Sequence, residues 1–191
     1  PKGTVRRLLS MPSNESTVQF SLNGSPASVS PGEGESLMTA LRERCNILSV
    51  KDGCSPQGQC GCCLVLMDGR AVTSCAVPVT KVEGKEVITL EGVSAEERLV
   101  LADSFAEAGA LQCGFCTPGL VLRTKHLLEK DASPDREKIA KAIDVHLCRC
   151  TGYTKIIDAI ERVAYKRRGE DLPERLANPR NPIRRADGRP P

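Results

Sequence analysis

Two groups of cysteines are the residues in this chain best suited to do chemistry. In the second group, Cys113 and Cys116 form a C-x2-C pair, and Cys148 and Cys150 form a C-x-C pair 31 residues further along. Each pair lies at the edge of a helical pattern, so the four thiols are expected to converge from helix termini. Thiolates are soft ligands that select zinc, copper(I) or iron–sulfur clusters. The spacing therefore predicts a soft-metal site.

The first group lies in a loop rich in Gly, Ser, Pro and Gln. Cys54, Cys60 and Cys63 are followed at a distance by Cys75. This order approximates the plant-type ferredoxin spacing, C-x4-C-x2-C and then a distant cysteine, with one extra residue between the first two. Cys62 is an alternative ligand. Because Cys60 and Cys63 keep the ferredoxin spacing, we expect Cys63 to be the ligand and Cys62 to pack beside the site.

Zinc and a [2Fe–2S] cluster are the two main alternatives for these sites. Structural zinc also takes four cysteines, but its second pair is usually C-x2-C or wider. A C-x-C pair crowds two sulfurs together, which a [2Fe–2S] cluster can accommodate, and the ferredoxin-like first group favours the cluster further. A zinc-stabilised interaction module remains the alternative from a different functional class.

The cysteines also bear on where the protein works. A disulfide scaffold would be typical of a short secreted chain with a signal peptide. Arg6 and Arg7 could begin a twin-arginine signal, but polar residues 10–15 follow where an apolar segment should be. We expect reduced thiols used as ligands in the cytoplasm, and a periplasmic location stays open if an upstream signal has been removed.

The remaining candidate residues offer no catalytic site. We expect Cys45 to be a core thiol and His126 a residue on a helix surface. His146 could be a ligand, although four cysteines already complete the second site, and Arg149 could contact a partner or cofactor. The sequence shows no nucleophile–base pair, no phosphate-binding glycine loop and no flavin or nicotinamide motif. Redox centres without catalytic residues indicate an electron conduit.

Composition sets broader limits. A chain of 191 residues with 40% hydrophobic and 27% charged residues can form one large or two small globular domains. No apolar run approaches the ~20 residues of a membrane span. The net charge of +3 arises in residues 162–191, which hold nine Lys/Arg and four Asp/Glu. With 3% aromatic residues and no Trp, nucleic-acid binding by the body of the chain is not expected.

The periodicity predicts an α+β unit followed by helices. Residues 17–22 alternate up to Asn23-Gly24, which predicts a hairpin with 27–30. A helix should run from 36 to Cys45, and short strands are expected at 63–67, 71–75 and 86–90. Four helices should then form a small bundle: from a capping box at 94–97 to 108, at 120–129 after Thr117-Pro118, at 136–147 after Ser133-Pro134, and at 153–167.

The cysteine motifs together resemble a known family. They are K-D-G-C at 51–54, C-G-C-C at 60–63, Q-C-G-F-C-T-P-G at 112–119 and L-C-R-C-T-G-Y at 147–153. Over roughly 17–168 the chain resembles the iron–sulfur subunit of the molybdenum hydroxylases, which include xanthine dehydrogenase, aldehyde oxidase and carbon monoxide dehydrogenase. The resemblance implies a β-grasp, plant-type ferredoxin-like [2Fe–2S] domain at 17–91 and a four-helix-bundle [2Fe–2S] domain at 92–168. An N-terminal extension at 1–16 and a Pro/Arg-rich tail or linker at 169–191 would flank them.

The same resemblance implies cofactors and partners. Electrons would leave a molybdenum centre on a large partner subunit and pass through both clusters to FAD, on a further subunit, or to another acceptor. Gln112 and the backbone of Cys150 would contact the molybdopterin cofactor of the partner. A free-standing ferredoxin is the remaining alternative. The implied ligands are Cys113, Cys116, Cys148 and Cys150 for the proximal cluster and Cys54, Cys60, Cys63 and Cys75 for the distal cluster.

Overall fold

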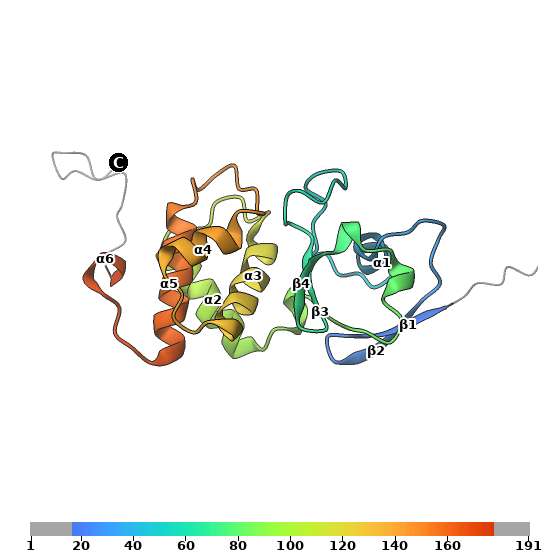
Figure 1. Ribbon diagram of the computed structural model, residues 1–191, viewed down its shortest axis with the longest axis horizontal. Helices are drawn as coiled ribbons and strands as arrows, with labels where there is room; N and C mark the ends of the chain where they lie inside the picture. The colour runs from blue at the N-terminus through green and yellow to red at the C-terminus, as the bar shows by residue number, and fades with distance from the viewer. Residues whose placement is uncertain (1–16, 178–191) are drawn as a thin grey trace, which may run out of the picture.

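The computed structural model describes residues 17–177 of the chain. The molecule is elongated, with a sheet region (residues 17–92) at one end and a helical region (residues 93–177) at the other (Figure 1). This mixed α+β architecture confirms the predicted fold class at that level. The sheet region contains β1 (Val18–Leu22), β2 (Ser25–Val29), α1 (Leu37–Glu43), β3 (Leu64–Met67), β4 (Arg70–Thr73) and β5 (Glu86–Ile88). The helical region contains α2 (Ala95–Glu107), α3 (Thr117–Lys130), α4 (Arg136–Ile143), α5 (Thr154–Arg168) and α6 (Glu174–Ala177).

Two tight turns with positive φ shape the sheet. Asn23 and Gly24 have φ of 55° and 82°, which suits the type I′ turn expected for a two-residue hairpin loop. They join β1 to β2 in an antiparallel pair, as the sequence predicted. Asp68 and Gly69, with φ of 47° and 71°, join β3 to β4 in the same way.

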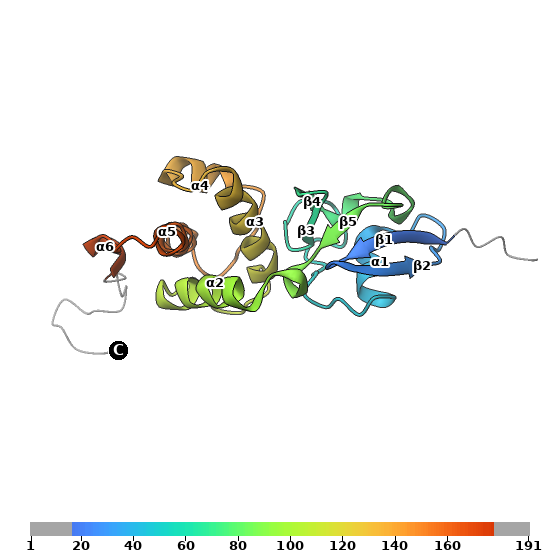
Figure 2. The ribbon, with the colours of Figure 1, turned by 90° about the horizontal axis from the view of Figure 1, so that it is seen from below.

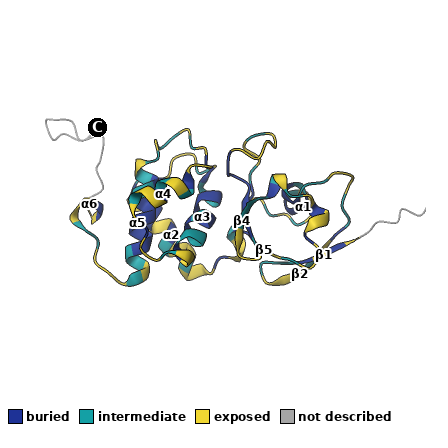
Figure 3. Ribbon diagram, in the orientation of Figure 1, coloured by how far each residue is buried: buried dark blue, intermediate teal, exposed yellow. Residues whose placement is uncertain are grey.

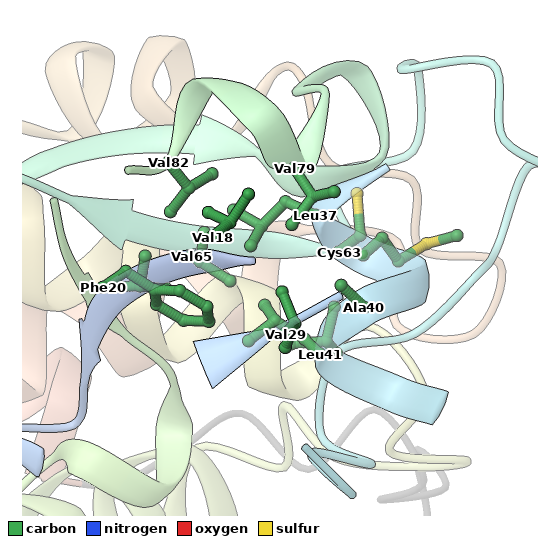
Figure 4. Packing of buried hydrophobic residues seen from close by; sticks show 13 residues of the cluster. Val18, Phe20, Val29, Leu37, Ala40, Leu41, Cys63, Val65, Val79 and Val82 are labelled. Carbon is green, nitrogen blue, oxygen red and sulfur yellow. The ribbon is translucent and has the colours of Figure 1, made fainter. Parts of the chain in front are cut away.

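The five strands form one mixed sheet in the order β2-β1-β5-β3-β4. β1 pairs with β5 in parallel, and the other neighbours are antiparallel. α1 packs its apolar side, including Leu37 and Leu41, against Phe20 and Val65 (Figure 4). α1 begins at the predicted place, with Ser36 as its N-cap, but it ends at Glu43. Cys45 lies just beyond the helix and still packs against the core.

In the helical region, the helix boundaries differ from the prediction at the cysteine turns. α2 begins with the predicted cap, because the Ser94 hydroxyl accepts a hydrogen bond from the Glu97 N–H. Cys116, rather than Thr117, is the N-cap of α3, and Asp135, rather than Ser133, caps α4. α4 ends at Ile143 instead of reaching Leu147. Residues 144–153 are therefore free to form the turn that carries the last two cysteines.

The two regions share a core. Successive residues of β3 point to opposite faces of the sheet, so Val65 faces α1 while Leu64 and Leu66 face the helices. These two leucines cluster with residues of α2, α3 and α5, including Val121 of α3. Figure 2 shows α3 between the sheet and the other helices. A shared apolar core fixes the helical region against β3 and β4.

The end of the described chain is packed against α5, which has many buried residues (Figure 3). Leu176 of α6 is only 2% exposed. Arg175 donates to both carboxylate oxygens of Glu161, and the buried Arg162 side chain donates to the Leu176 carbonyl. Leu176 belongs to the segment predicted as a tail or linker, yet it is buried. The predicted extension at 1–16 and the rest of the tail at 178–191 lie outside the described residues. Within residues 17–177, no helix is both long and apolar enough to span a membrane.

Candidate metal centres

The loop that carries the first thiol set is folded by its own polar contacts. Asp52 accepts a hydrogen bond from the Ser55 N–H at 2.8 Å, and the Cys54 sulfur accepts one from the Gln57 N–H at 3.2 Å. Gly58 and Gly61 have φ of 70° and 67°, a conformation that favours glycine. The loop therefore turns its backbone amides toward the thiols, an arrangement that stabilises negatively charged sulfur.

The thiols of the first set lie as two pairs. Hydrogen bonds from the backbone N–H groups of Gln59 and Gln57 lower the pKa of Cys54 to about 7, and the Cys60 thiol is a further hydrogen-bond partner. Burial, followed by a hydrogen bond with the Cys63 thiol, raises the pKa of Cys75 to about 12. The structure thus pairs Cys54 with Cys60 and Cys63 with Cys75.

A buried serine holds the second of these pairs together. The Ser74 hydroxyl donates to the Cys63 carbonyl at 2.7 Å, and the Ser74 backbone N–H donates to the same oxygen at 3.2 Å. Ser74 directly precedes Cys75 in a short 3-10 turn. These bonds place Cys75 opposite the strand that begins after Cys63.

Cys62 faces away from this pair and toward the helical region. Its side chain packs with Cys60 and Cys116, whereas Cys63 packs in the core of the sheet region. Burial, followed by the nearby Cys60 thiol, raises the pKa of Cys62 to about 12. Cys62 thus lies against Cys60 and Cys116, and the choice of Cys63 over Cys62 as the ligand stays a prediction.

The second thiol set also consists of two pairs, at the start of α3 and in the turn before α5. The sulfurs of Cys113 and Cys150 are 3.5 Å apart. Burial, followed by a hydrogen bond with the Cys148 thiol, raises the pKa of Cys116 to about 12. The four predicted residues therefore lie together as Cys113 with Cys150 and Cys116 with Cys148.

Tyr153 organises the turn around Cys148. Its hydroxyl donates to the His146 carbonyl at 2.8 Å and accepts a hydrogen bond from the Cys148 N–H at 3.0 Å. Its φ of 69° is unusual for a bulky residue and marks a constrained turn. Thr151 adds a contact of 3.2 Å between its hydroxyl and the Cys148 sulfur.

Gln112 lies at the exposed end of the second set. Its side-chain amide donates to the Cys150 carbonyl at 3.0 Å. The two residues expected to contact a partner's cofactor are thus brought together. Arg149 lies beside them and lines a cavity of about 240 Å³ between the two thiol sets. The other lining residues are Gly53, Cys60, Cys62, Cys113, Phe115, Cys116, Leu147, Cys148 and Cys150.

The two thiol sets are joined by a backbone hydrogen bond. The Leu147 N–H donates to the Cys60 carbonyl at 3.0 Å. Leu147 precedes Cys148, so this single bond connects a residue of the first set to the neighbour of a residue of the second. This hydrogen bond cannot be predicted from the spacing of residues along the sequence, because it forms only when the two regions pack together.

The two histidines lie in different places, one along α3 and one against the first cysteine loop. His126 lies on α3 as expected, but it is partly buried and its Nε2 atom has no hydrogen-bond partner within the described residues. His146 is completely buried and lies against Gly61 rather than among the cysteine sulfurs. Burial lowers the pKa of His146 to about 4.

The donor chemistry fits iron–sulfur clusters. All ten cysteines are free thiols. Within residues 17–177, no three His, Cys, Asp or Glu side chains form a ready site for a single metal ion, and the candidate ligands instead face one another in pairs. A [2Fe–2S] cluster takes four ligands shared between two irons. A small α+β chain that presents cysteines in this way belongs to the class of iron–sulfur proteins.

Comparison with known proteins identifies the family. Residues 89–161 match a family model described as a [2Fe-2S] binding domain. The nicotinate dehydrogenase small FeS subunit of Eubacterium barkeri is 43% identical over 148 residues, which cover 77% of this chain and 94% of that protein. The xanthine dehydrogenase iron-sulfur-binding subunit of Escherichia coli O157:H7 is 41% identical over 151 residues, covering 75% and 91%. In the crystal structure of quinoline 2-oxidoreductase from Pseudomonas putida 86, a chain that is 40% identical superimposes with a TM-score of 0.72, covering 81% of this chain and 98% of that one.

The chain belongs to the family of small iron–sulfur subunits of the molybdenum hydroxylases. It is an electron-transfer subunit of an oxidoreductase, as the sequence motifs predicted.

Proposed function

We propose that the chain holds two [2Fe–2S] clusters, one in each thiol set, and passes electrons between a molybdenum centre on a large subunit and an acceptor. The four paired contacts carry this proposal, because each pair can serve one iron of a two-iron cluster. When bound, such clusters supply one-electron oxidation and reduction. The proposed pairs are Cys54 with Cys60, Cys63 with Cys75, Cys113 with Cys150, and Cys116 with Cys148.

The two regions then act as two electron-transfer domains. We assign 17–91 to a β-grasp, plant-type ferredoxin-like domain and 92–168 to a four-helix-bundle domain. The family match over 89–161 and the mixed five-stranded sheet support this division. The Leu147 N–H to Cys60 carbonyl bond supports direct transfer between the domains, because it links the backbone next to Cys148 to that of Cys60.

The open side of the second thiol set is the proposed docking face for the large subunit. Leu111, Phe115 and Leu147 are among the large apolar residues that remain exposed in the described chain. Phe115 and Leu147 line the same cavity as Arg149, and Leu111 directly precedes Gln112. Apolar side chains beside polar groups are typical of the centre of an interface. Gln112 and the Cys150 carbonyl would there reach the molybdopterin cofactor of the partner.

The remaining parts of the assignment follow from the family and the thiols. FAD on a further subunit is the proposed acceptor, with another electron acceptor as the alternative. A cytoplasmic location is proposed because ten free thiols suit a reducing compartment.

Purification of the full chain under anaerobic conditions, with and without a co-expressed large subunit, tests the function. We expect a red-brown protein with two irons and two sulfides for each cluster, two distinct EPR signals after reduction, and co-purification with the large subunit. A colourless protein that contains two zinc ions would overturn the proposal in favour of a structural module. A coloured protein that never associates with a large molybdenum subunit would favour a free-standing ferredoxin.

Matched serine variants test the ligand choice in the first set. Cys62→Ser is expected to keep both EPR signals, since Cys62 packs outside the Cys63–Cys75 pair. Cys63→Ser is expected to lose or strongly shift the signal of the sheet region. The opposite result for the two variants would make Cys62 the ligand.

A further inference from the structure

A buried histidine fills the junction between the two thiol sets. His146 is 0% exposed and lies two residues before Cys148, in the turn after α4. Its ring lies directly against Gly61, the residue after Cys60. A Cβ atom placed on Gly61 would be 2.7 Å from Cδ2 of His146 and 2.9 Å from Cγ. The ring therefore occupies the space that any side chain at position 61 would need.

A second glycine closes the junction from the other side. A Cβ atom placed on Gly119, in the first turn of α3, would be 2.3 Å from the carbonyl oxygen of Gly61 and 3.4 Å from Cα of Cys62. The backbone of α3 thus touches the backbone of the first cysteine loop. We call Gly61, Gly119 and His146 the histidine seam.

Hydrogen bonding does not explain why an imidazole lies in this seam. Neither ring nitrogen has a hydrogen-bond partner within the described residues. The Gly119 carbonyl lies near the ring, but the contact lacks hydrogen-bond geometry. A buried polar group with an incomplete hydrogen bond is costly, so hydrogen bonding contributes little to holding the ring in this position. What the ring does provide is a rigid contact with Gly61 at the point where the two regions meet.

We propose that His146 is a positioning residue for electron transfer between the two clusters. This inference rests on the proposed function, because it requires a cluster in each thiol set. The ring and the two glycines fix the spacing and orientation of Cys60 relative to Cys148. Contacts behind metal ligands orient those ligands and tune the centre, and the rate of electron tunnelling falls steeply with distance. The transfer moves one electron from the helical set to the sheet set, with no bond made or broken.

Two variants change the seam from opposite sides. His146→Ala removes the ring and leaves the junction underpacked. Gly119→Ala adds a methyl group that meets the Gly61 carbonyl, so the two backbones must move apart. This second variant keeps the His146 ring and disturbs the seam from the α3 side, so it tests the junction even if the first variant is unstable. His126→Ala is the matched control, because His126 also has an unpartnered ring nitrogen but lies along α3 away from Gly61.

The experiment uses the full chain in complex with its large subunit. EPR of the fully reduced complex measures the magnetic splitting between the clusters, and rapid-freeze EPR measures the rate at which the second cluster is reduced. We expect both variants to keep two cluster signals, to show a narrowed or lost splitting, and to transfer electrons several-fold more slowly. The His126→Ala control is expected to match the wild-type chain.

Each contrary result has a distinct meaning. Wild-type splitting and rate in both seam variants would overturn the positioning role, even if their melting temperatures fall. Loss of a whole cluster in both variants would also overturn it, because the seam would then be needed to hold a cluster rather than to space two. A wild-type chain with a single cluster would instead refute the proposed function, and the inference with it.

Discussion

The two thiol sets differ in how far the chain itself encloses them. In the sheet region, Cys60 and Cys63 are 3% and 2% exposed, and Ser74 ties the Cys63–Cys75 pair from within the core. In the helical region only Cys116 is buried, and Cys113 lies at the surface. One site is largely enclosed by its own fold, whereas the other is exposed at Cys113 and along the cavity between the two sets.

The surroundings of the open site show what the difference means. Leu147 is 58% exposed and Phe115 is 44% exposed, although both are large apolar residues next to proposed ligands. Exposed apolar groups around a redox site do not stabilise a monomer. They stabilise a complex when a partner subunit buries them. This exposure agrees with the proposed docking face, where a larger subunit would cover the helical site, while the sheet site is more enclosed by its own region.

The largest expected effect separates the two sites by removing one of them. Cys150→Ala deletes one sulfur of the Cys113–Cys150 pair and leaves every contact of the sheet region in place. We expect complete loss of the helical EPR signal with the sheet signal intact. Cys45→Ala is the control, because Cys45 packs against the core and belongs to neither set. Loss of both signals in Cys150→Ala would mean that the two sites are not independently held.

A charge on the open side tests whether it is the partner face. Leu147→Glu leaves the backbone bond from Leu147 to Cys60 available but places a carboxylate in the exposed apolar group. We expect affinity for the large subunit to fall about tenfold or more, as for central interface residues. Leu99→Glu is the control, because Leu99 is 63% exposed on α2, outside the cavity between the sets. Equal binding by both variants, measured by biolayer interferometry, would contradict this docking face.

Local signals in the sequence predicted those parts of the structure that depend on local chemistry. The Asn23-Gly24 hairpin follows from two residues that tolerate positive φ, and the Ser94 cap follows from a hydroxyl placed before a helix. The grouping of the cysteines into two sets was also predictable, because short spacing along the chain forces proximity.

The remaining features depend on contacts between distant residues. α4 ends at Ile143, and the freed turn allows Leu147 to bond Cys60 in the other region. Leu176 lies against α5, where Arg162 donates to its carbonyl and Glu161 accepts from the neighbouring Arg175, and no local pattern predicts these contacts. His146 could be considered only as a ligand, since nothing in the sequence places Gly61 beside it.

A smaller effect is expected from the turn that shapes the open site. Tyr153→Phe removes a hydroxyl that bonds both the His146 carbonyl and the Cys148 N–H. Two lost hydrogen bonds correspond to about 1–3 kcal/mol of unfolding free energy, measurable by urea denaturation. The helical EPR signal should broaden while the sheet signal stays unchanged. Tyr165→Phe on α5 is the matched control, and an equal change in that variant would remove Tyr153 from this role.

The smallest expected effect concerns the response of the two regions to acid. Each region has an ion pair with one buried member: Glu35 with the exposed Arg44 in the sheet region, and the half-exposed Glu107 with the buried Arg162 in the helical region. The side-chain hydrogen bond from Arg44 lowers the pKa of Glu35, and that from Arg162 lowers the pKa of Glu107. Because both carboxyl groups have folded-state pKa values below the unfolded value of 4.5, their stabilisation is complete above that pH and is lost as the pH falls through the folded values.

The consequence of protonation differs between the two pairs. Protonated Glu35 is a neutral acid beside an exposed arginine, whereas protonated Glu107 leaves the buried guanidinium of Arg162 with neutral oxygen partners only, such as the Leu176 carbonyl. We therefore expect Glu107→Gln to lower Tm at pH 7 more than Glu35→Gln does. Below pH 4.5, Tm should also fall less steeply with pH in Glu107→Gln than in Glu35→Gln. A pair with one solvent-exposed member contributes at most about 1 kcal/mol, which corresponds to about 2–4 °C in Tm. The measurement is Tm as a function of pH for both variants. Identical curves would contradict the idea that the buried Arg162 makes the helical region more sensitive to acid.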